Sequence, residues 1–127
     1  MQAVDTNVLV RLLTRDDKDQ AERATSLFQR KEVWIAKTVL LETAWVLRSL
    51  YAYGQRQITA ALRGVAGLEN VRIEDSAAVA RAFKLTDAGV EFADALHLVS
   101  MGDAESLVTL DKKFAAKAKK LARVATL

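Results

Sequence analysis

Short apolar runs alternate along the chain with longer segments in which apolar positions recur every three or four residues. The short runs have the length of strands, and the longer segments have the period of helices with one buried face. Strands are therefore expected at 1–4, 33–36, 71–73 and 106–110, with a last edge strand near Val124. Helices are expected from Thr6 to Leu13, from 16 to about 30, and at 38–53, 55–68, 75–87, 91–101 and 112–121.

The order of these elements predicts the fold class. Strands that alternate with helices from end to end are typical of an α/β fold, with a central, mostly parallel sheet flanked by helices. No repeat, low-complexity tract or domain boundary interrupts the pattern. The 127 residues, 51% of them apolar, suffice for one hydrophobic core, so residues 1–127 are expected to form a single domain.

Composition excludes several kinds of site. The chain has no cysteine and one histidine, which excludes disulfide scaffolds, thiolate metal sites and zinc sites with two or more histidines. No apolar stretch approaches the roughly 20 residues of a membrane helix, so no membrane partner is expected. The amino terminus has no basic region followed by an apolar one, as a signal peptide would. We therefore expect a cytoplasmic protein.

Positive charge is concentrated near the carboxyl terminus. The net charge is +3, yet residues 112–127 contain six basic and no acidic side chains, so the preceding 111 residues carry a net charge of −3. A cationic segment of this kind is expected in a protein that binds a polyanion such as nucleic acid. It is equally expected of a terminal helix that lysines keep soluble, and both interpretations stay open.

Four acidic residues stand within or directly after apolar segments. Asp5 and Asp111 directly follow two predicted strands, while Glu42 and Asp94 lie within apolar helical segments. An unpaired charge in apolar surroundings costs several kcal/mol or shifts its pKa. These positions therefore need either a structural or a functional explanation.

Structural explanations exist for each of these acids. Asp5 and Asp111 could cap the helices that follow them. Glu42 could turn towards Lys37 or Arg48. Asp94 could pair with an arginine across the fold.

The only histidine of the chain, His97, lies three residues after Asp94, on roughly the same helix face. We expect His97 to be a partly buried structural residue rather than a metal ligand.

Together, the four acids favour a metal site. The carboxyl ends of parallel strands share one edge of a sheet, and helices that start from this edge would bring all four carboxylates together. Two carboxylates about 4 Å apart repel by roughly 4 kcal/mol at an effective dielectric constant of about 20, so protonation, arginines or a divalent cation must compensate. All-oxygen ligands favour Mg²⁺ or Mn²⁺ over zinc, and such ions support phosphodiester hydrolysis.

The four acids lie in four characteristic segments, namely AVDTNVLVRLLTRDD at 3–17, TVLLETAWVL at 38–47, FADALHL at 92–98 and LVTLDKKF at 107–114. In order and spacing, these segments resemble the motifs of PIN-domain ribonucleases, specifically the VapC-type toxins of toxin–antitoxin pairs. The resemblance spans nearly the whole chain.

The resemblance implies a Mg²⁺- or Mn²⁺-dependent endoribonuclease with a PIN-like fold. It also implies a homodimer and a cognate VapB-type antitoxin that blocks the site. The family's catalytic, metal-binding acids match Asp5, Glu42, Asp94 and Asp111. Its small polar residue after the first acid matches Asn7, and its hydroxyl residue before the last matches Thr109.

One of the two interpretations of the basic helix at 112–121 is that it holds RNA phosphates, and the other is that it is a solvated terminal helix. On this helix Lys113, Lys117 and Lys120 would share one face, with Lys112 and Lys119 beside it. The apolar side would pack inward, and it consists of Phe114, Ala118 and Leu121.

Two other classes of protein stay open. A phospho-receiver-like signalling domain is also α/β with acids at strand ends, but it needs an acidic pair after the first strand, where this chain has Asp5-Thr6-Asn7. A non-catalytic RNA- or protein-binding module would keep the fold alone, and the intact set of four acids argues against it. A haloacid-type phosphatase is disfavoured, because it needs an acid two residues after its nucleophilic Asp and Asn7 occupies that position.

Overall fold

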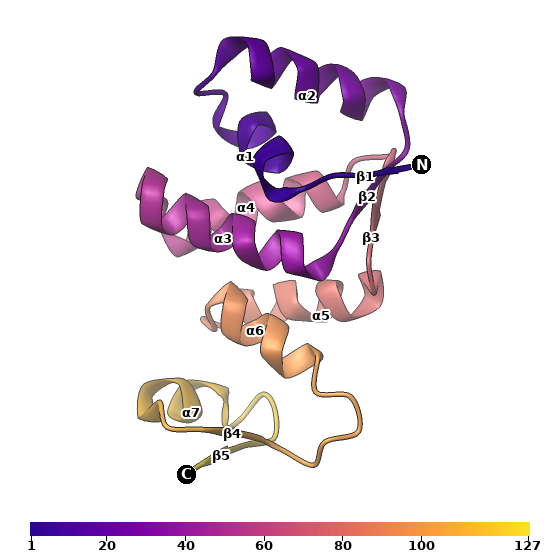
Figure 1. The fold of residues 1–127 in the computed structure, drawn as a ribbon. Coiled ribbons are helices and arrows are strands. Elements are labelled where there is room, and N and C mark those ends of the chain that lie inside the picture. The colour runs from indigo at the N-terminus through magenta and orange to yellow at the C-terminus, as the bar shows by residue number, and fades with distance from the viewer. The chain divides into compact units, whose positions relative to one another are not determined.

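In the computed structural model, which describes residues 1–127, helices and strands alternate from end to end as the sequence predicts (Figure 1). The elements divide into two units, Met1–Ser76 and Ala77–Leu127, which are called unit 1 and unit 2 below. Every strand pair is parallel, so the predicted α/β class with parallel strands and flanking helices is confirmed.

Unit 1 consists of a three-stranded parallel sheet and four helices. The strands, hydrogen-bonded in chain order, are β1 (Gln2–Ala3), β2 (Val33–Ile35) and β3 (Val71–Ile73). The helices are α1 (Thr6–Thr14), α2 (Lys18–Arg30), α3 (Lys37–Tyr51) and α4 (Gln55–Ala66). Because β1 and β2 run in the same direction, α1 and α3 both begin at the carboxyl edge of this sheet.

Unit 2 contains a separate two-stranded parallel ladder and three helices. Its strands are β4 (Leu107–Thr109) and β5 (Val124–Thr126). Its helices are α5 (Ser76–Asp87), which begins at the last residue of unit 1, α6 (Phe92–Val99) and α7 (Lys112–Ala118). The apolar faces that the periodicity predicts are buried, and the rings of Phe83 and Phe92 pack with their centroids 5.6 Å apart.

Local signals explain where several elements begin and end. Asp5, Asp17 and Asp111 each accept a backbone N–H in the first turn of a helix, so each closes an otherwise open helix end. Gly89 follows α5 with a φ of 99°, and the N–H of Val90 donates to Leu85 O at 3.1 Å. This left-handed turn after a helix favours glycine because it has no Cβ.

The carboxyl-terminal helix is shorter than predicted. α7 ends at Ala118 rather than at residue 121, because the chain then turns into β5. Phe114 and Ala118 are buried as expected, but the prediction that Leu121 packs inward is wrong, since 44% of it is exposed. Lys120 also lies beyond the helix, so it does not share a helical face with Lys113.

No helix of the structure is both long enough and apolar enough to cross a membrane. The prediction that the chain forms a single domain stays a prediction.

Candidate active site

Asp5 and Asp111 stand directly after strands and cap the helices that follow. Asp5 Oδ1 accepts the N–H of Val8 at 3.2 Å, and Asp111 Oδ1 accepts the N–H of Phe114 at 3.0 Å. The structural explanation by capping is therefore confirmed for both residues. It is compatible with metal binding, because both side chains are exposed and no hydrogen bond engages either Oδ2 atom.

Thr109 holds the backbone next to Asp111. The N–H of Asp111 donates to Thr109 Oγ1 at 3.0 Å, across the turn between β4 and α7. A side-chain hydroxyl that accepts an N–H two residues later makes a compact turn. The contact fixes the backbone from which the Asp111 carboxylate projects.

Asp94 differs from the other three acids because it is half-buried. It lies in the first turn of α6, and no hydrogen bond or ion pair holds its carboxylate. Burial raises the pKa of Asp94 above its ordinary value, the negative charges of Glu91 and Asp111 raise it further, and His97 opposes them. Asp94 and Asp111 are therefore close enough to repel each other, and no arginine compensates the charge of Asp94.

His97 lies on α6, one turn after Asp94. Its side chain is exposed, so the expectation of a partly buried structural histidine is wrong. The reason is that α6 buries the face that contains Phe92, Ala95 and Leu96, and His97 lies on the opposite side of the helix.

Glu42 is exposed on α3 and has no ion-pair partner. A pairing with Lys37 is not found, because Lys37 Nζ lies 3.2 Å from Asp75 Oδ2. The N–H of Lys37 donates to Glu74 Oε1 at 2.8 Å, which caps α3 where Ala36 has no side chain to do so. The end of β3 thus holds the start of the helix that carries Glu42.

The expected burial of the four acids is therefore mostly wrong. Three of them stand at a helix start or on the outer face of a helix, where water solvates the charge: Asp5, Glu42 and Asp111. Asp94 alone carries the burial cost that the apolar pattern predicts.

An open cleft of about 580 Å³ lies beside Asp5 in unit 1, between α1 and α2. Its polar lining includes Asn7, Arg11, Gln20 and Arg23. Asn7 is exposed next to Asp5, as a supporting residue would be. Both arginines of this cleft are already paired, since Arg11 Nη1 lies 3.2 Å from Asp16 and Arg23 Nη1 lies 3.5 Å from Asp19.

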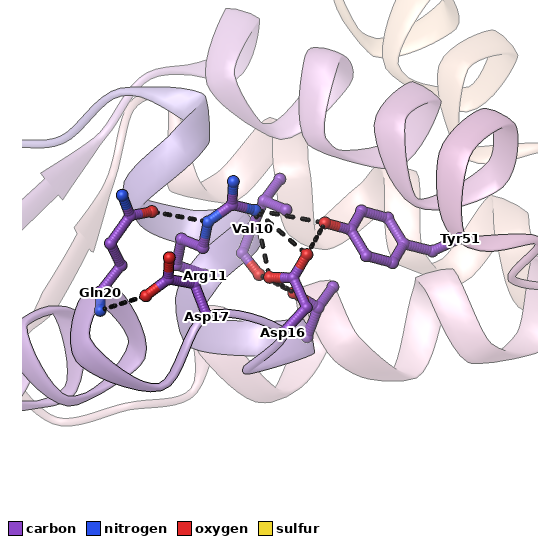
Figure 2. A network of polar contacts seen from close by, with 7 residues as sticks. Val10, Arg11, Asp16, Asp17, Gln20 and Tyr51 are labelled. Carbon is purple, nitrogen blue, oxygen red and sulfur yellow. Dashed lines mark hydrogen bonds and ion pairs between the residues drawn. The ribbon is translucent and has the colours of Figure 1, made fainter.

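Figure 2 shows that Arg11 of α1 contacts Gln20 of α2, Tyr51 at the end of α3, and Asp16 between α1 and α2. Its Nε donates to Gln20 Oε1 at 2.7 Å, and its Nη1 donates to Tyr51 Oη at 3.2 Å. The Tyr51 hydroxyl in turn donates to Asp16 Oδ2. This last hydrogen bond, ahead of the contributions of Thr14 and Arg11, lowers the pKa of Asp16.

Sequence reasoning missed this network. The neighbouring pair Asp16-Asp17 offered one signal, because a helix start needs a single capping residue. Asp17 Oδ1 takes that role by accepting the N–H of Gln20 at 3.0 Å, which leaves Asp16 for Arg11 and Tyr51.

The predicted RNA-binding lysines are all exposed. Lys112, Lys113 and Lys117 lie on α7, and Lys120 lies in the turn after it. None of these four forms an ion pair.

The structure divides the four acids into two pairs. Asp5 and Glu42 belong to unit 1, and Asp94 and Asp111 belong to unit 2. No group of three or more Asp, Glu or His side chains lies close enough together to hold a metal ion. The four-carboxylate site therefore stays a prediction. Within unit 2, Asp111 is near enough to Asp94 for its negative charge to raise the pKa of Asp94.

Comparison with known families gives one match. The model of a domain family described as the PIN domain matches residues 3–120, which include all four acids and parts of both units. Comparison with curated proteins gives no match.

Proposed function

Because the chain belongs to the PIN domain family, whose members are generally metal-dependent nucleases, we propose that it is a Mg²⁺- or Mn²⁺-dependent endoribonuclease. The observation that carries the proposal is the state of Asp94. A half-buried carboxylate without an ion pair, next to a second carboxylate, is costly for the fold. Such groups cluster at functional sites, and a bound cation would remove the cost.

The residues fit a hard divalent cation. Asp94 and Asp111 supply two carboxylates that already repel each other, and Asp111 has an oxygen left over from its cap. Oxygen donors of this kind suit Mg²⁺ and Mn²⁺. We propose that units 1 and 2 form one domain, as the match to residues 3–120 supports, and that Asp5 and Glu42 complete the site.

When bound, the ion would activate a water molecule and stabilise the charge on the scissile phosphate. The chain's own residues would orient this chemistry. The hydrogen bonds to Val8 and Phe114 hold the carboxylates of Asp5 and Asp111 in one direction. Thr109 would fix the turn before Asp111, and Asn7 would place a neutral polar group beside Asp5 without adding a charge.

The proposed biological role is that of a toxin in a type II toxin–antitoxin pair. The order and spacing of the four motifs, similar to those of VapC-type toxins, support it. Trp45 on α3 is 63% exposed and lies three residues after Glu42, so the two side chains share a helix face. A VapB-type antitoxin that covers Trp45 would also cover Glu42. The resemblance to VapC-type toxins also supports a homodimer of two copies of this chain.

RNA would also contact the lysines of α7. Lys112, Lys113 and Lys117 are exposed and unpaired, and α7 begins at Asp111. RNA phosphates held along α7 would therefore lie next to one of the proposed metal ligands.

Cleavage of single-stranded RNA in the presence of Mg²⁺ or Mn²⁺ tests the proposal. The Asp94→Asn and Asp111→Asn variants should each lose more than about 100-fold in cleavage rate. Even the loss of a residue that only hydrogen-bonds to a metal ligand lowers activity by about 10- to 100-fold. Asp19→Asn, on the exposed side of α2, is the matched control and should cleave like the wild type. If the wild type binds RNA but never cleaves it at any metal concentration, the chain is a non-catalytic binding module.

A further inference from the structure

An open cleft of about 750 Å³ lies within unit 2, and its charged lining is entirely basic. No Asp or Glu lines it. The cations come from three segments distant in sequence, namely α5, the turn after α7 and the residue before β5: Arg81, Lys84, Lys119, Lys120 and Arg123.

These five cations have no acidic partners. None of them takes part in an ion pair, whereas both arginines of the cleft beside Asp5 do. Unpaired like charges that face one cleft repel each other, and a bound anion is what relieves such repulsion. Arg81 and Lys84 also stand one turn apart on α5, so the helix presents both on the same face.

Three elements of unit 2 show that the cleft lies at the end of this unit away from Asp94 and Asp111. Asp94 stands in the first turn of α6, whereas Leu98 and Val99 from its last turn line the cleft. Asp111 follows the carboxyl end of β4, whereas Arg123 O accepts the N–H of Leu107 at the amino end of the same ladder.

The third element is α7, which Asp111 caps at its start and whose end leads into Lys119 and Lys120. A seven-residue helix and a three-residue ladder are each about 10 Å long. The cleft is therefore a separate anion site and not a part of the carboxylate site.

We propose that this cleft binds backbone phosphates of an RNA strand at a distance from the phosphate that is cleaved. The identity of the ligand rests on the proposed nuclease function. Five unpaired cations along an open cleft exceed what one phosphate group would need, and they suit a polyanion.

The chemistry of the lining also predicts how the RNA is held. No aromatic residue lines the cleft, so the stacking platform of many single-strand binders is missing. Binding through phosphates should depend strongly on salt and little on sequence.

Binding of a fluorescently labelled single-stranded RNA across a range of salt concentrations, with EDTA present to prevent cleavage, tests the proposal. The variant Lys84→Ser, Lys119→Ser, Arg123→Ser removes three cations of the cleft. Each lost phosphate contact should flatten the log–log salt dependence by about 0.7, so the slope should fall by about 2.

The matched control removes two lysines and one arginine from exposed positions of unit 1 and should leave the slope unchanged: Lys18→Ser, Lys31→Ser and Arg56→Ser. A second cleft variant, Arg81→Gln with Lys120→Gln, should lower the slope by about 1.4 and keeps the test intact if the triple variant unfolds. Thermal unfolding of every variant verifies the fold.

Several outcomes would overturn the proposal. These are an unchanged slope in both cleft variants, an equal fall in the control, and cleft-dependent binding of inorganic tripolyphosphate or a polyglutamate peptide without cleft-dependent binding of RNA. A parallel cleavage assay with Mg²⁺ or Mn²⁺ separates the two proposals. Cleavage with an unchanged slope overturns the cleft alone, and cleft-dependent binding without cleavage overturns the nuclease alone.

Discussion

The two clefts, one in each unit, differ in whether their cations are paired. In unit 1, Arg11 is held by Asp16, Gln20 and Tyr51, so its charge is already neutralised and its position fixed. In unit 2, the five cations of the basic cleft form no ion pair. A paired arginine stabilises the fold and has little attraction left for an anion, whereas an unpaired one is available to a ligand.

The acids show a related contrast. Asp5 and Glu42 of unit 1 are exposed, whereas Asp94 of unit 2 is half-buried and its pKa is raised. Unit 2 therefore contains both the carboxylate with the raised pKa and the cleft lined by unpaired cations. We therefore expect ligands to change the stability of the protein through these residues of unit 2, together with Asp5 and Glu42 of unit 1 where the metal is concerned.

The largest expected effect is stabilisation by a divalent metal. At about 100 times its Kd, an ion that binds only the folded state should raise the free energy of unfolding by about 2.7 kcal/mol. Thermal unfolding with Mg²⁺ or Mn²⁺ against excess EDTA measures this gain. The double variant Asp94→Asn with Asp111→Asn should abolish it.

The same measurement asks whether the two units share one site. The variant Asp5→Asn with Glu42→Gln should also reduce the gain if the four acids bind the metal together. A gain that survives in this variant would place the metal in unit 2 alone and would contradict the proposed four-carboxylate site. An equal melting temperature of the wild type with metal and with EDTA would contradict any metal site.

A smaller effect separates the two roles of Asp5. Asp5→Ala removes the cap of α1 and should lower the free energy of unfolding by about 1 kcal/mol. Asp5→Asn keeps an oxygen that accepts the N–H of Val8, so stability should hardly change while RNA cleavage is lost. Denaturant unfolding and the cleavage assay measure the two effects. Near wild-type cleavage by Asp5→Asn would mean that Asp5 is only a cap.

Most of the fold could be predicted because its signals are local. Every predicted strand and helix is present, and the capping residues Asp5, Asp17 and Asp111 act within three residues of their own position. The end of α7 could not be read from helical periodicity, because the turn after Ala118 leads the chain into the β4–β5 ladder. Pairing with a distant strand is a tertiary effect, which overrides the local pattern.

The sites could be predicted less completely than the elements. The lysines of the carboxyl-terminal segment lie close together in sequence, whereas the basic cleft also includes Arg81 and Lys84, which stand about 35 residues earlier. Sequence spacing contains no signal for such a meeting of separate segments. Likewise, the apolar neighbours of Glu42 in sequence suggested burial, but its own position on the helix faces water.

The raised pKa of Asp94 predicts how stability depends on pH. A carboxyl whose pKa is raised in the folded state does not lower the free energy of unfolding at a pH below its ordinary pKa of 3.8. The free energy of unfolding falls as the pH rises from 3.8 through the folded-state pKa. In EDTA, Asp94→Asn should therefore be more stable than the wild type at neutral pH, and the difference should vanish towards low pH. Denaturant unfolding over a pH series measures it. Lower stability of Asp94→Asn at neutral pH would mean that the carboxylate has a favourable partner.

The smallest expected effect concerns the network around Arg11 in unit 1. Tyr51→Phe removes the hydroxyl that donates to Asp16 and lowers its pKa. A lowered pKa contributes stability above the ordinary value of 3.8, and this stability is lost as pH falls through the folded-state pKa. The variant should therefore melt slightly below the wild type at neutral pH, and the two should converge in acid.

Tyr53→Phe, which removes the hydroxyl of a second half-buried tyrosine of unit 1, is the control for this last effect and should show no such pH dependence. RNA binding sharpens the contrast between the units. Arg11 keeps its ion pair with Asp16 in the Tyr51→Phe variant, so the salt dependence of RNA binding should stay that of the wild type. A flatter salt dependence in this variant would show that Arg11 contacts phosphate despite its partners, and pairing within unit 1 would then not separate structural cations from ligand-binding ones.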